Sequence, residues 1–330
     1  MTITHLLSKP VTLYTDTDGD GKACALLLAK WCDSNRIHIQ REFPKCRTNV
    51  AAPTTPIVVM TDWVPNDLDQ FLADNPDVQR CIVVDHHPWD DDTRTDPRIV
   101  KVHDTSMCAA QILYKQLGFK DRILQEFVDH IGYHDLFTAP NGVPLPEAHI
   151  SLRAAVAKCN ATVHYACSKK GTVDGFFASL HGGYFRTLGR YIQQVRDDDA
   201  FVARLMNSKY VKHAENHWHF DNVLFSSENP NEAWEYSRVM SLLGYKLSKR
   251  FKKAGFFLNM KSFPDGDVYG LGFRSCTGTN MSARQLKDIM VHYSEDEPTA
   301  SGATRTDGGH EKACGMNGYM KTAYELWKEF

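Results

Sequence analysis

Short apolar runs alternate with longer, helix-like stretches over the first 140 residues. Residues 11–14 (VTLY), 57–60 (IVVM) and 81–84 (CIVV) are such runs. Bulky or β-branched residues bounded by polar turns are typical of buried parallel strands. Strands that alternate with helices form the right-handed crossover units of a doubly wound sheet. The pattern therefore predicts an α/β fold built on a doubly wound, mainly parallel sheet.

The pattern changes after this first part of the chain. Apolar positions follow helical spacing over residues 109–210. Strand character returns at residues 217–225, a helix is expected at 234–253, and two strands are expected on either side of the turn at 264–267. These features predict a second, smaller α/β domain joined by a helical linker. The expected parts are the parallel-sheet domain over 1–190, a connecting helix over 191–216 and the second domain over 217–330.

Acidic residues follow all three predicted strands, and two histidines follow the third. In a doubly wound sheet, ligands bind beyond the carboxyl ends of the strands. Carboxylates gathered there repel one another strongly unless cations compensate them. A set of Asp and His without Cys suits Mn²⁺, with Mg²⁺ or Co²⁺ as substitutes, and two ions ~3.5–4 Å apart hydrolyse phosphate esters. The residues at these strand ends are Asp16, Asp18, Asp20, Asp62, Asp85, His86 and His87.

The hexapeptide at residues 16–21 (DTDGDG) allows other interpretations. An EF-hand calcium loop needs a Glu at its twelfth position. Leu27 occupies that position here, so we exclude an EF-hand. A phosphatase of the haloacid dehalogenase type would use Asp16 as nucleophile and Asp18 as general acid. That alternative gives no role to Asp62 or to the histidines, but it stays open at this point.

The order of these motifs resembles that of the DHH phosphoesterases, which are named for an Asp-His-His triplet. The triplet here is residues 85–87, the first family motif resembles residues 16–21, and the second resembles Asp62. Asp135 best matches the fourth motif. Residues 307–315 (DGGHEKACG) resemble the Gly-Gly-His segment of the DHH-associated domain that many members carry.

The resemblance implies a role for each matching residue. One metal ion would be held by Asp18 and Asp62, and the other by Asp20, Asp62, His86 and Asp135, with Asp62 bridging. His87 would face the scissile phosphate as a catalytic residue, and Asp85 would orient the histidines. In the second domain, the resemblance implies substrate binding by Arg274, Gly308, Gly309 and His310.

One position departs from the family pattern. Many members have a His four residues before the first metal-binding Asp, and this chain has Tyr14 there. Asp16 would then supply the missing ligand. Without that ligand, the chain would be a catalytically silent nucleotide-binding protein, which is a second alternative.

Composition narrows the expected location and substrate. The 330 residues include 38 Lys and Arg against 40 Asp and Glu, a formal net charge of −2, so we expect no broad basic surface for long duplex nucleic acid. The longest apolar run, residues 23–29, is far shorter than the ~18 residues of a membrane span. The start of the chain lacks the features of a signal peptide. We therefore expect a cytoplasmic phosphoesterase, similar to an exonuclease or oligoribonuclease, that acts on short oligonucleotides or small nucleotide phosphodiesters.

Overall fold

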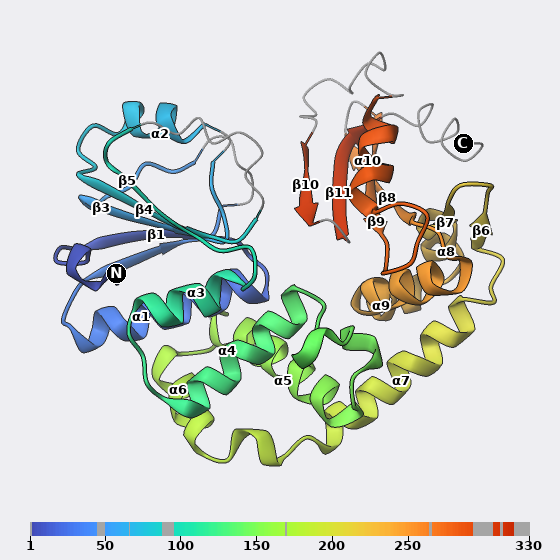
Figure 1. Cartoon of the computed structure of the whole chain (residues 1–330), viewed down its shortest axis with the longest axis horizontal. Helices are drawn as coiled ribbons and strands as arrows, with labels where there is room; N and C mark the ends of the chain where they lie inside the picture. The colour runs from blue at the N-terminus through green and yellow to red at the C-terminus, as the bar shows by residue number, and fades with distance from the viewer. Residues whose placement is uncertain are drawn as a thin grey trace. The chain divides into compact units, whose positions relative to one another are not determined.

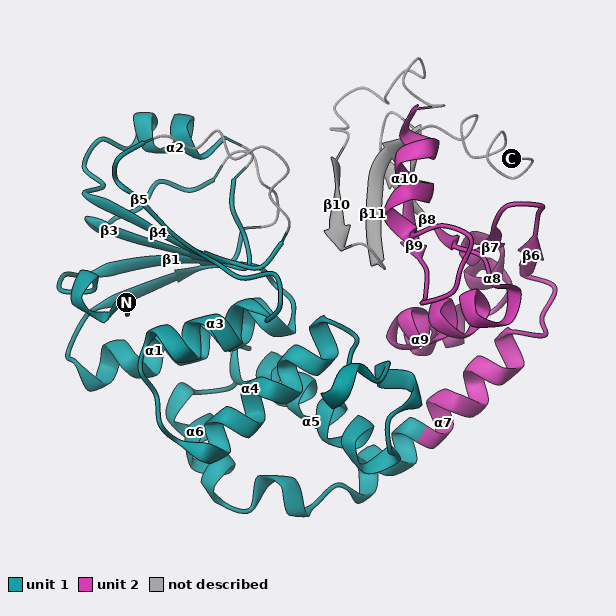
Figure 2. Ribbon diagram, viewed as in Figure 1, with its two compact units in different colours: residues 1–195 teal, residues 196–330 magenta. Residues whose placement is uncertain are grey.

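The computed structural model describes most of the chain and divides it into two compact units, Met1–Val195 and Arg196–Phe330 (Figure 2). For residues 259–263, 266–270, 306–310 and 313–319 it describes the backbone only. None of the helices within the described ranges is long and apolar enough to cross a membrane. The described ranges are 2–44, 50–65, 67–87, 96–168, 170–263, 266–292, 306–310 and 313–319.

Unit 1 contains the predicted parallel sheet. Its strands lie in the order β2-β1-β3-β4-β5, and every neighbouring pair is parallel. The three predicted strands form β1, β3 and β4, which lie side by side. The bounds are β1 Val11–Thr15, β2 Ile39–Glu42, β3 Ile57–Thr61, β4 Arg80–Asp85 and β5 Ile99–His103.

Helices cover both faces of this sheet, as the apolar strand pattern predicts (Figure 1). The large core that includes Leu13 of β1 packs against α1, α3 and α4, whereas Tyr14 belongs to a second core with α2. Because successive strand residues point to opposite faces, two adjacent residues of β1 serve two different cores. The helices of unit 1 are α1 Gly19–Ser34, α2 Leu68–Asp74, α3 Ala109–Gln116, α4 Arg122–Asp135, α5 Ile150–Ala166 and α6 Val173–His181.

The chain passes from unit 1 to unit 2 within α7, Gly189–Leu205. Tyr191 and Val195 pack against Ala154 of α5 in unit 1, and Val202 and Leu205 belong to a core of unit 2. The helix ends at Leu205, before the end of the connecting helix predicted for residues 191–216. A strand, β6 Val211–His213, follows within that range.

Unit 2 is a mixed sheet with helices, which agrees with the predicted second α/β fold. Its strand order is β10-β11-β9-β8-β7-β6. Among these described strands, β7 and β8 pair in parallel and the other neighbouring pairs are antiparallel. The strand predicted at residues 217–225 is shorter than expected because Asp221 accepts a hydrogen bond from Leu224 N and starts a helix. The bounds are β7 Trp218–Phe220, α8 Asn222–Glu228, α9 Ala233–Phe251, β8 Gly255–Phe263, β9 Gly266–Arg274, α10 Ala283–His292, β10 Thr306–His310 and β11 Ala313–Tyr319.

Candidate metal centre

A buried histidine at the end of β4 faces three carboxylates from different elements. His86 Nε2 lies 3.2 Å from Asp62 Oδ1, 3.4 Å from Asp135 Oδ2 and 3.7 Å from Asp20 Oδ2. The His86 side chain is 1% exposed. The structure thus brings together all four residues that the family resemblance implies for one of the two metal ions.

The Asp20 carboxylate is held by the start of a neighbouring helix. Asp20 lies in the first turn of α1, and its two oxygens accept hydrogen bonds of 2.8 Å from the backbone N–H groups of Ala109 and Ala110. These N–H groups belong to the first turn of α3, where backbone donors have no partner within the helix. A carboxylate is a favourable acceptor there. Residues 104–108 (DTSMC), followed by an apolar helical pattern, are a signal for a helix start. No local pattern, however, indicates that this helix start lies against Asp20.

Asp62, the residue after β3, has an unusual backbone conformation. Its φ is +56°, in the left-handed region that few residues other than Gly, Asn and Asp adopt. Its N–H donates to Val84 O at 3.0 Å, and the residue is buried. The conformation turns the chain sharply at the strand end, so that the carboxylate faces His86 and not one of the two cores.

Asp135 is the last residue of α4, and a second aspartate on that helix has a different environment. The Asp129 carboxylate accepts hydrogen bonds from the side-chain amides of Gln111 at 2.9 Å and Gln125 at 3.0 Å. Asp135 Oδ2 is buried and has no hydrogen-bond partner within the described residues. The structure therefore places Asp135, and not Asp129, beside His86.

The third residue of the triplet is oriented by the first. Asp85 Oδ1 accepts the backbone N–H of His86 at 2.8 Å and of His87 at 3.2 Å, and lies 2.9 Å from His87 Nδ1. His87 Nδ1 also lies 3.7 Å from Asp62 Oδ1. The Asp85 carboxylate thus fixes the turn after β4 and the orientation of the His87 ring, which is the kind of support that a metal-bound or catalytic imidazole needs.

The carboxylates of the site are held in an environment that disfavours their charge. Burial, with repulsion from Asp18 added to it, raises the pKa of Asp20 to about 7. Burial and the neighbouring carboxylates also raise the pKa values of Asp62 and Asp135 well above their usual range. Within the part of the chain that the structure describes, no Lys or Arg forms an ion pair with these three residues. A divalent cation would supply the missing positive charge.

The geometry of the donor atoms fits metal ions. Two groups, Asp20-His86-Asp135 and Asp62-His86-His87, each offer ligand atoms within 4.8 Å of one another among the described residues. Carboxylate oxygens and imidazole nitrogens are both common ligands of divalent metal ions in proteins. The cluster can therefore hold divalent metal, and all its residues belong to unit 1.

The other two aspartates of the first motif lie outside both groups. Asp18 is exposed and caps α1 by accepting the N–H of Gly21 at 3.0 Å. The Asp16 carboxylate accepts the N–H of Thr17 in its own loop. The roles that the resemblance implies for them, as ligands of the other metal ion, stay predictions.

Tyr14, at the position where the family resemblance leads one to expect a His, is a core residue in this chain. It is fully buried, its hydroxyl donates to Ala51 O at 2.6 Å, and its ring stacks on Trp63 at 6.1 Å. The side chain is thus engaged on the α2 face of the sheet and belongs to neither ligand group. Its burial explains why Tyr fits at this position, where it contributes packing in place of a metal ligand.

The predicted substrate-binding residues lie in unit 2. Arg274, the last residue of β9, is partly buried, and its Nη1 donates to Phe273 O at 2.7 Å. A Cβ added at Gly244 of α9 would lie 2.6 Å from Arg274 Cγ, so Gly244 makes room for this side chain. Gly308, Gly309 and His310 lie in β10, which pairs with β11. The structure does not describe the side chains of these three residues, and residues 311 and 312 lie outside the described ranges.

Comparisons with known proteins agree with this fold. No protein-family model matches the chain, and no curated protein matches its sequence. Among the solved structures that match 97% of this chain is a DHH domain described as a member of the s1p family of ribosomal proteins, with 15% identity, a TM-score of 0.60 and 86% of that chain covered. CDC45 from Entamoeba histolytica matches with 9% identity, a TM-score of 0.53 and 94% of its chain covered. RecJ from Thermus thermophilus in complex with Mn²⁺ matches with 11% identity, a TM-score of 0.51 and 51% of its chain covered.

The chain spans about half the length of that RecJ structure. At these identities the likeness concerns the fold. It agrees with the resemblance that the Asp-His-His triplet carries and with the parallel sheet of unit 1. This chain therefore has the fold of the DHH family.

Proposed function

We propose that this chain is a metal-dependent phosphoesterase that hydrolyses short oligonucleotides or small nucleotide phosphodiesters. The observation that carries the proposal is the convergence of Asp20, Asp62 and Asp135 on His86 Nε2 within 3.7 Å. The RecJ neighbour, a structure of similar fold, is a complex with Mn²⁺. Buried, mutually repelling carboxylates are costly to keep, which favours a functional role over a structural one.

Asp20, Asp62, His86 and Asp135 would hold one divalent ion, with Asp62 shared with a second. When bound, paired ions activate water as a nucleophile and neutralise the charge that develops on the phosphoryl oxygens. Mn²⁺ is our first choice, and Mg²⁺ and Co²⁺ are the other candidates for the same donor set.

His87 suits the role of a proton donor to the leaving group. Its side chain is 25% exposed, unlike that of His86, so it reaches the surface on which a substrate would lie. With Nδ1 held by Asp85, Nε2 is the ring nitrogen that would exchange a proton with the leaving oxygen. Asp85 thereby acts as a positioning residue for His87.

A short substrate fits the overall charge of the chain. The formal net charge is −2, whereas proteins that hold long nucleic acid through phosphate contacts usually present a strongly basic surface. We therefore propose di- to pentanucleotides as substrates before long DNA or RNA.

The test is a turnover assay on the full chain with Mn²⁺ and labelled di- to pentanucleotides. We expect Asp135→Asn and His86→Ala to lower kcat/KM by about 100-fold or more, because each removes a candidate ligand. Asp129→Asn is the matched control. It lies on the same helix and keeps an oxygen for both glutamine amides, so it should retain activity within about threefold.

Two results would replace this proposal. Loss of activity confined to Asp16→Asn, with a phosphoenzyme trapped in the parent protein, would show a haloacid-dehalogenase-type phosphatase. Binding of oligonucleotides without turnover under Mn²⁺, Mg²⁺ or Co²⁺ would show a catalytically silent nucleotide-binding protein.

A further inference from the structure

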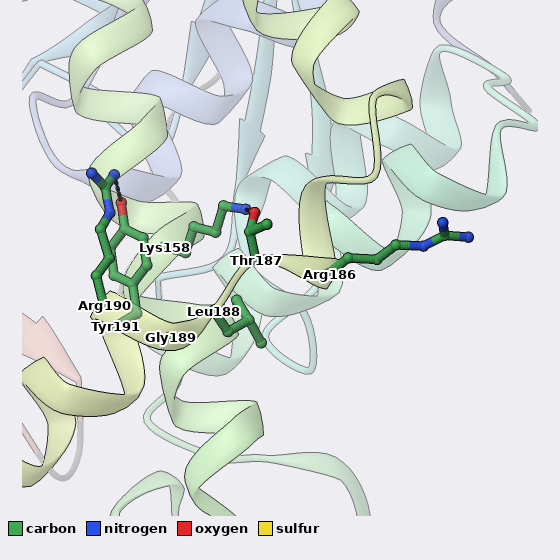
Figure 3. Close-up of a pocket in the computed structure, with 7 residues that line it drawn as sticks. All are labelled: Lys158, Arg186, Thr187, Leu188, Gly189, Arg190 and Tyr191. Carbon is green, nitrogen blue, oxygen red and sulfur yellow. Dashed lines mark hydrogen bonds between the residues drawn. The ribbon is translucent and has the colours of Figure 1, made fainter.

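A second charged site lies in unit 1, among residues that the candidate metal centre does not use. A pocket of about 440 Å³ is formed by Lys158 of α5, by the segment that follows the short helix Tyr184–Arg186, and by the first residues of α7 (Figure 3). Its lining contains three cationic side chains and no acidic one. The lining residues are Lys158, Arg186, Thr187, Leu188, Gly189, Arg190 and Tyr191.

The charges of this pocket are not compensated by the protein. Among the described residues, Lys158, Arg186 and Arg190 form no ion pair with a carboxylate. Basic residues of unit 2 differ in this respect: Arg238 lies 2.6 Å from Asp198, and Lys246 lies 3.5 Å from Asp199. Cations placed together without a counter-charge repel each other and favour an anion from outside.

Local contacts hold two of the cations in place. Lys158 Nζ donates to Tyr184 O, lies 3.4 Å from Thr187 Oγ1 and sits 4.1 Å from the centre of the Tyr184 ring. Burial and the nearby charge of Arg190 lower the pKa of Lys158. Arg190 Nη2 donates to Tyr191 Oη at 2.6 Å, and its guanidinium stacks over that ring. Both side chains are therefore oriented before any anion arrives, which reduces the entropy lost on binding.

The third cation extends the site along the surface. Arg186 is exposed, and Figure 3 shows its guanidinium directed away from Arg190, with Lys158 and Thr187 between them. The space beside Gly189 is open, since a Cβ added there would meet no atom within 4 Å. An arrangement that spreads its charges along a segment suits a ligand that carries several phosphates in a row better than a single inorganic phosphate.

We propose that this pocket binds the phosphodiester backbone of a single-stranded oligonucleotide, away from the scissile phosphate. The planar, forked donors of Arg186 and Arg190 match phosphate oxygens, and Lys158 adds a third contact between them. The choice of an oligonucleotide among polyanions rests on the proposed function.

Binding and turnover can be tested separately. We would measure the fluorescence anisotropy of a labelled single-stranded hexanucleotide with the full chain in EDTA, which removes metal and prevents hydrolysis. Arg186→Gln and Arg190→Gln should each raise Kd about three- to tenfold, since each loses one charged hydrogen-bonding partner. The double variant should also reduce the slope of log Kd against log salt by about 1.4, at about 0.7 per lost single-strand phosphate contact.

The controls distinguish the pocket from general charge and from misfolding. Arg196→Gln removes the same charge from the same helix, six residues beyond Arg190 and outside the pocket lining, and should leave Kd within about twofold. Arg186 is exposed, and its side chain forms no hydrogen bond or ion pair within the described residues, so its variant should melt like the parent protein. Unchanged binding by the double variant, or equal weakening by Arg196→Gln, would overturn the proposal.

Failure of the pocket and failure of the proposed function give different results. If the parent protein hydrolyses oligonucleotides but the double variant binds the hexanucleotide normally, only the pocket proposal is wrong. If no phosphorylated substrate is turned over but the variants weaken hexanucleotide binding, the pocket stands and the phosphoesterase proposal fails.

Discussion

At the scale of single residues, the candidate metal centre combines the buried imidazole of His86 with carboxylates that are difficult to keep charged. Asp20 is held by two backbone N–H groups, Asp62 by an unusual backbone turn, and Asp135 by its place at the end of α4. Each of these features fixes a carboxylate oxygen near His86 before a cation is present. The free energy of unfolding should therefore respond to charge at these positions in a way that ordinary surface aspartates do not.

One consequence concerns stability without metal. Burial and repulsion from neighbouring carboxylates raise the pKa of Asp135, so its charged form is costly in the metal-free protein. Asp135→Asn removes that cost, so in EDTA at pH 8 the variant should have a higher Tm than the parent. The same change should abolish most of the stabilisation that Mn²⁺ gives. Thermal unfolding with and without Mn²⁺ measures both effects. A lower Tm for the variant in EDTA would contradict the charge argument, and Asp129→Asn should show no such gain.

A second consequence is the pH dependence of the metal-free protein. The pKa of Asp20 is raised from 3.8 to about 7, so between these values the folded state binds more protons than the unfolded state. Its contribution to the free energy of unfolding therefore decreases as pH rises from about 4 to 7. Asp62 and Asp135 act in the same direction. Because metal binds the deprotonated carboxylates, the Tm increase produced by Mn²⁺ should be larger at pH 8 than at pH 6. An equal or smaller increase at pH 8 would show that these groups do not bind the metal.

At the scale of elements, the sequence predicts those strands and helices that a local pattern of apolar and polar residues determines. The runs at residues 11–14, 57–60 and 81–84 predicted β1, β3 and β4 because buried parallel strands are apolar on both faces. The sequence did not reveal β2, Ile39–Glu42, because this strand of the sheet edge carries mostly polar residues. In unit 2, a strand was expected to continue to residue 225, but the Asp221 cap starts α8 instead.

Contacts between distant elements decide the rest of the site. Asp135 best matches the fourth family motif, but Asp129 lies only six residues earlier. The contacts of Gln111 and Gln125 show that Asp129 is already bonded elsewhere. The cationic pocket was not predicted either, because Lys158 lies far along the chain from Arg186 and Arg190. No local pattern records that α5 packs beside the start of α7.

The loop before α1 offers a prediction at this scale. A Cβ at Gly21 would lie 2.4 Å from the backbone oxygen of Asp16, which cannot move without shifting the acidic loop. Gly21→Ala should destabilise the protein by about 1–3 kcal/mol and weaken Mn²⁺ binding through displaced Asp18 and Asp20. Calorimetric titration and thermal melts would measure these effects. Gly189→Ala, where the added Cβ meets no atom, is the control, and parent-like metal affinity in Gly21→Ala would contradict the expected displacement.

At the scale of the whole molecule, the two units have separate cores and different chemistry. The metal-ligand candidates and the cationic pocket belong to residues before Val195. Arg274 and the Gly308–His310 segment, for which the family resemblance implies substrate binding, belong to unit 2. Metal binding alone therefore acts on one unit directly.

Hydrogen exchange would test this division. Mg²⁺ or Mn²⁺ should slow amide exchange in α1, α3, the end of α4 and the segment after β3, because bound metal opposes local opening of the residues that hold it. Exchange in α9 and α10 should change little, since no candidate ligand lies in these helices. Equal protection of both units would show that unit 2 also responds to the metal.

The backbone turn at Asp62 has a practical consequence for recognising distant relatives. Only a few residue types adopt its φ of +56° at low cost, and of these Asp alone carries a carboxylate. As the proposed metal ligand, this residue would have to satisfy a torsional requirement and a coordination requirement at once, so we expect few residue types to be tolerated there. An aspartate with left-handed torsion directly after a buried parallel strand is a compact structural signature, which can be sought among chains whose overall identity is too low for alignment.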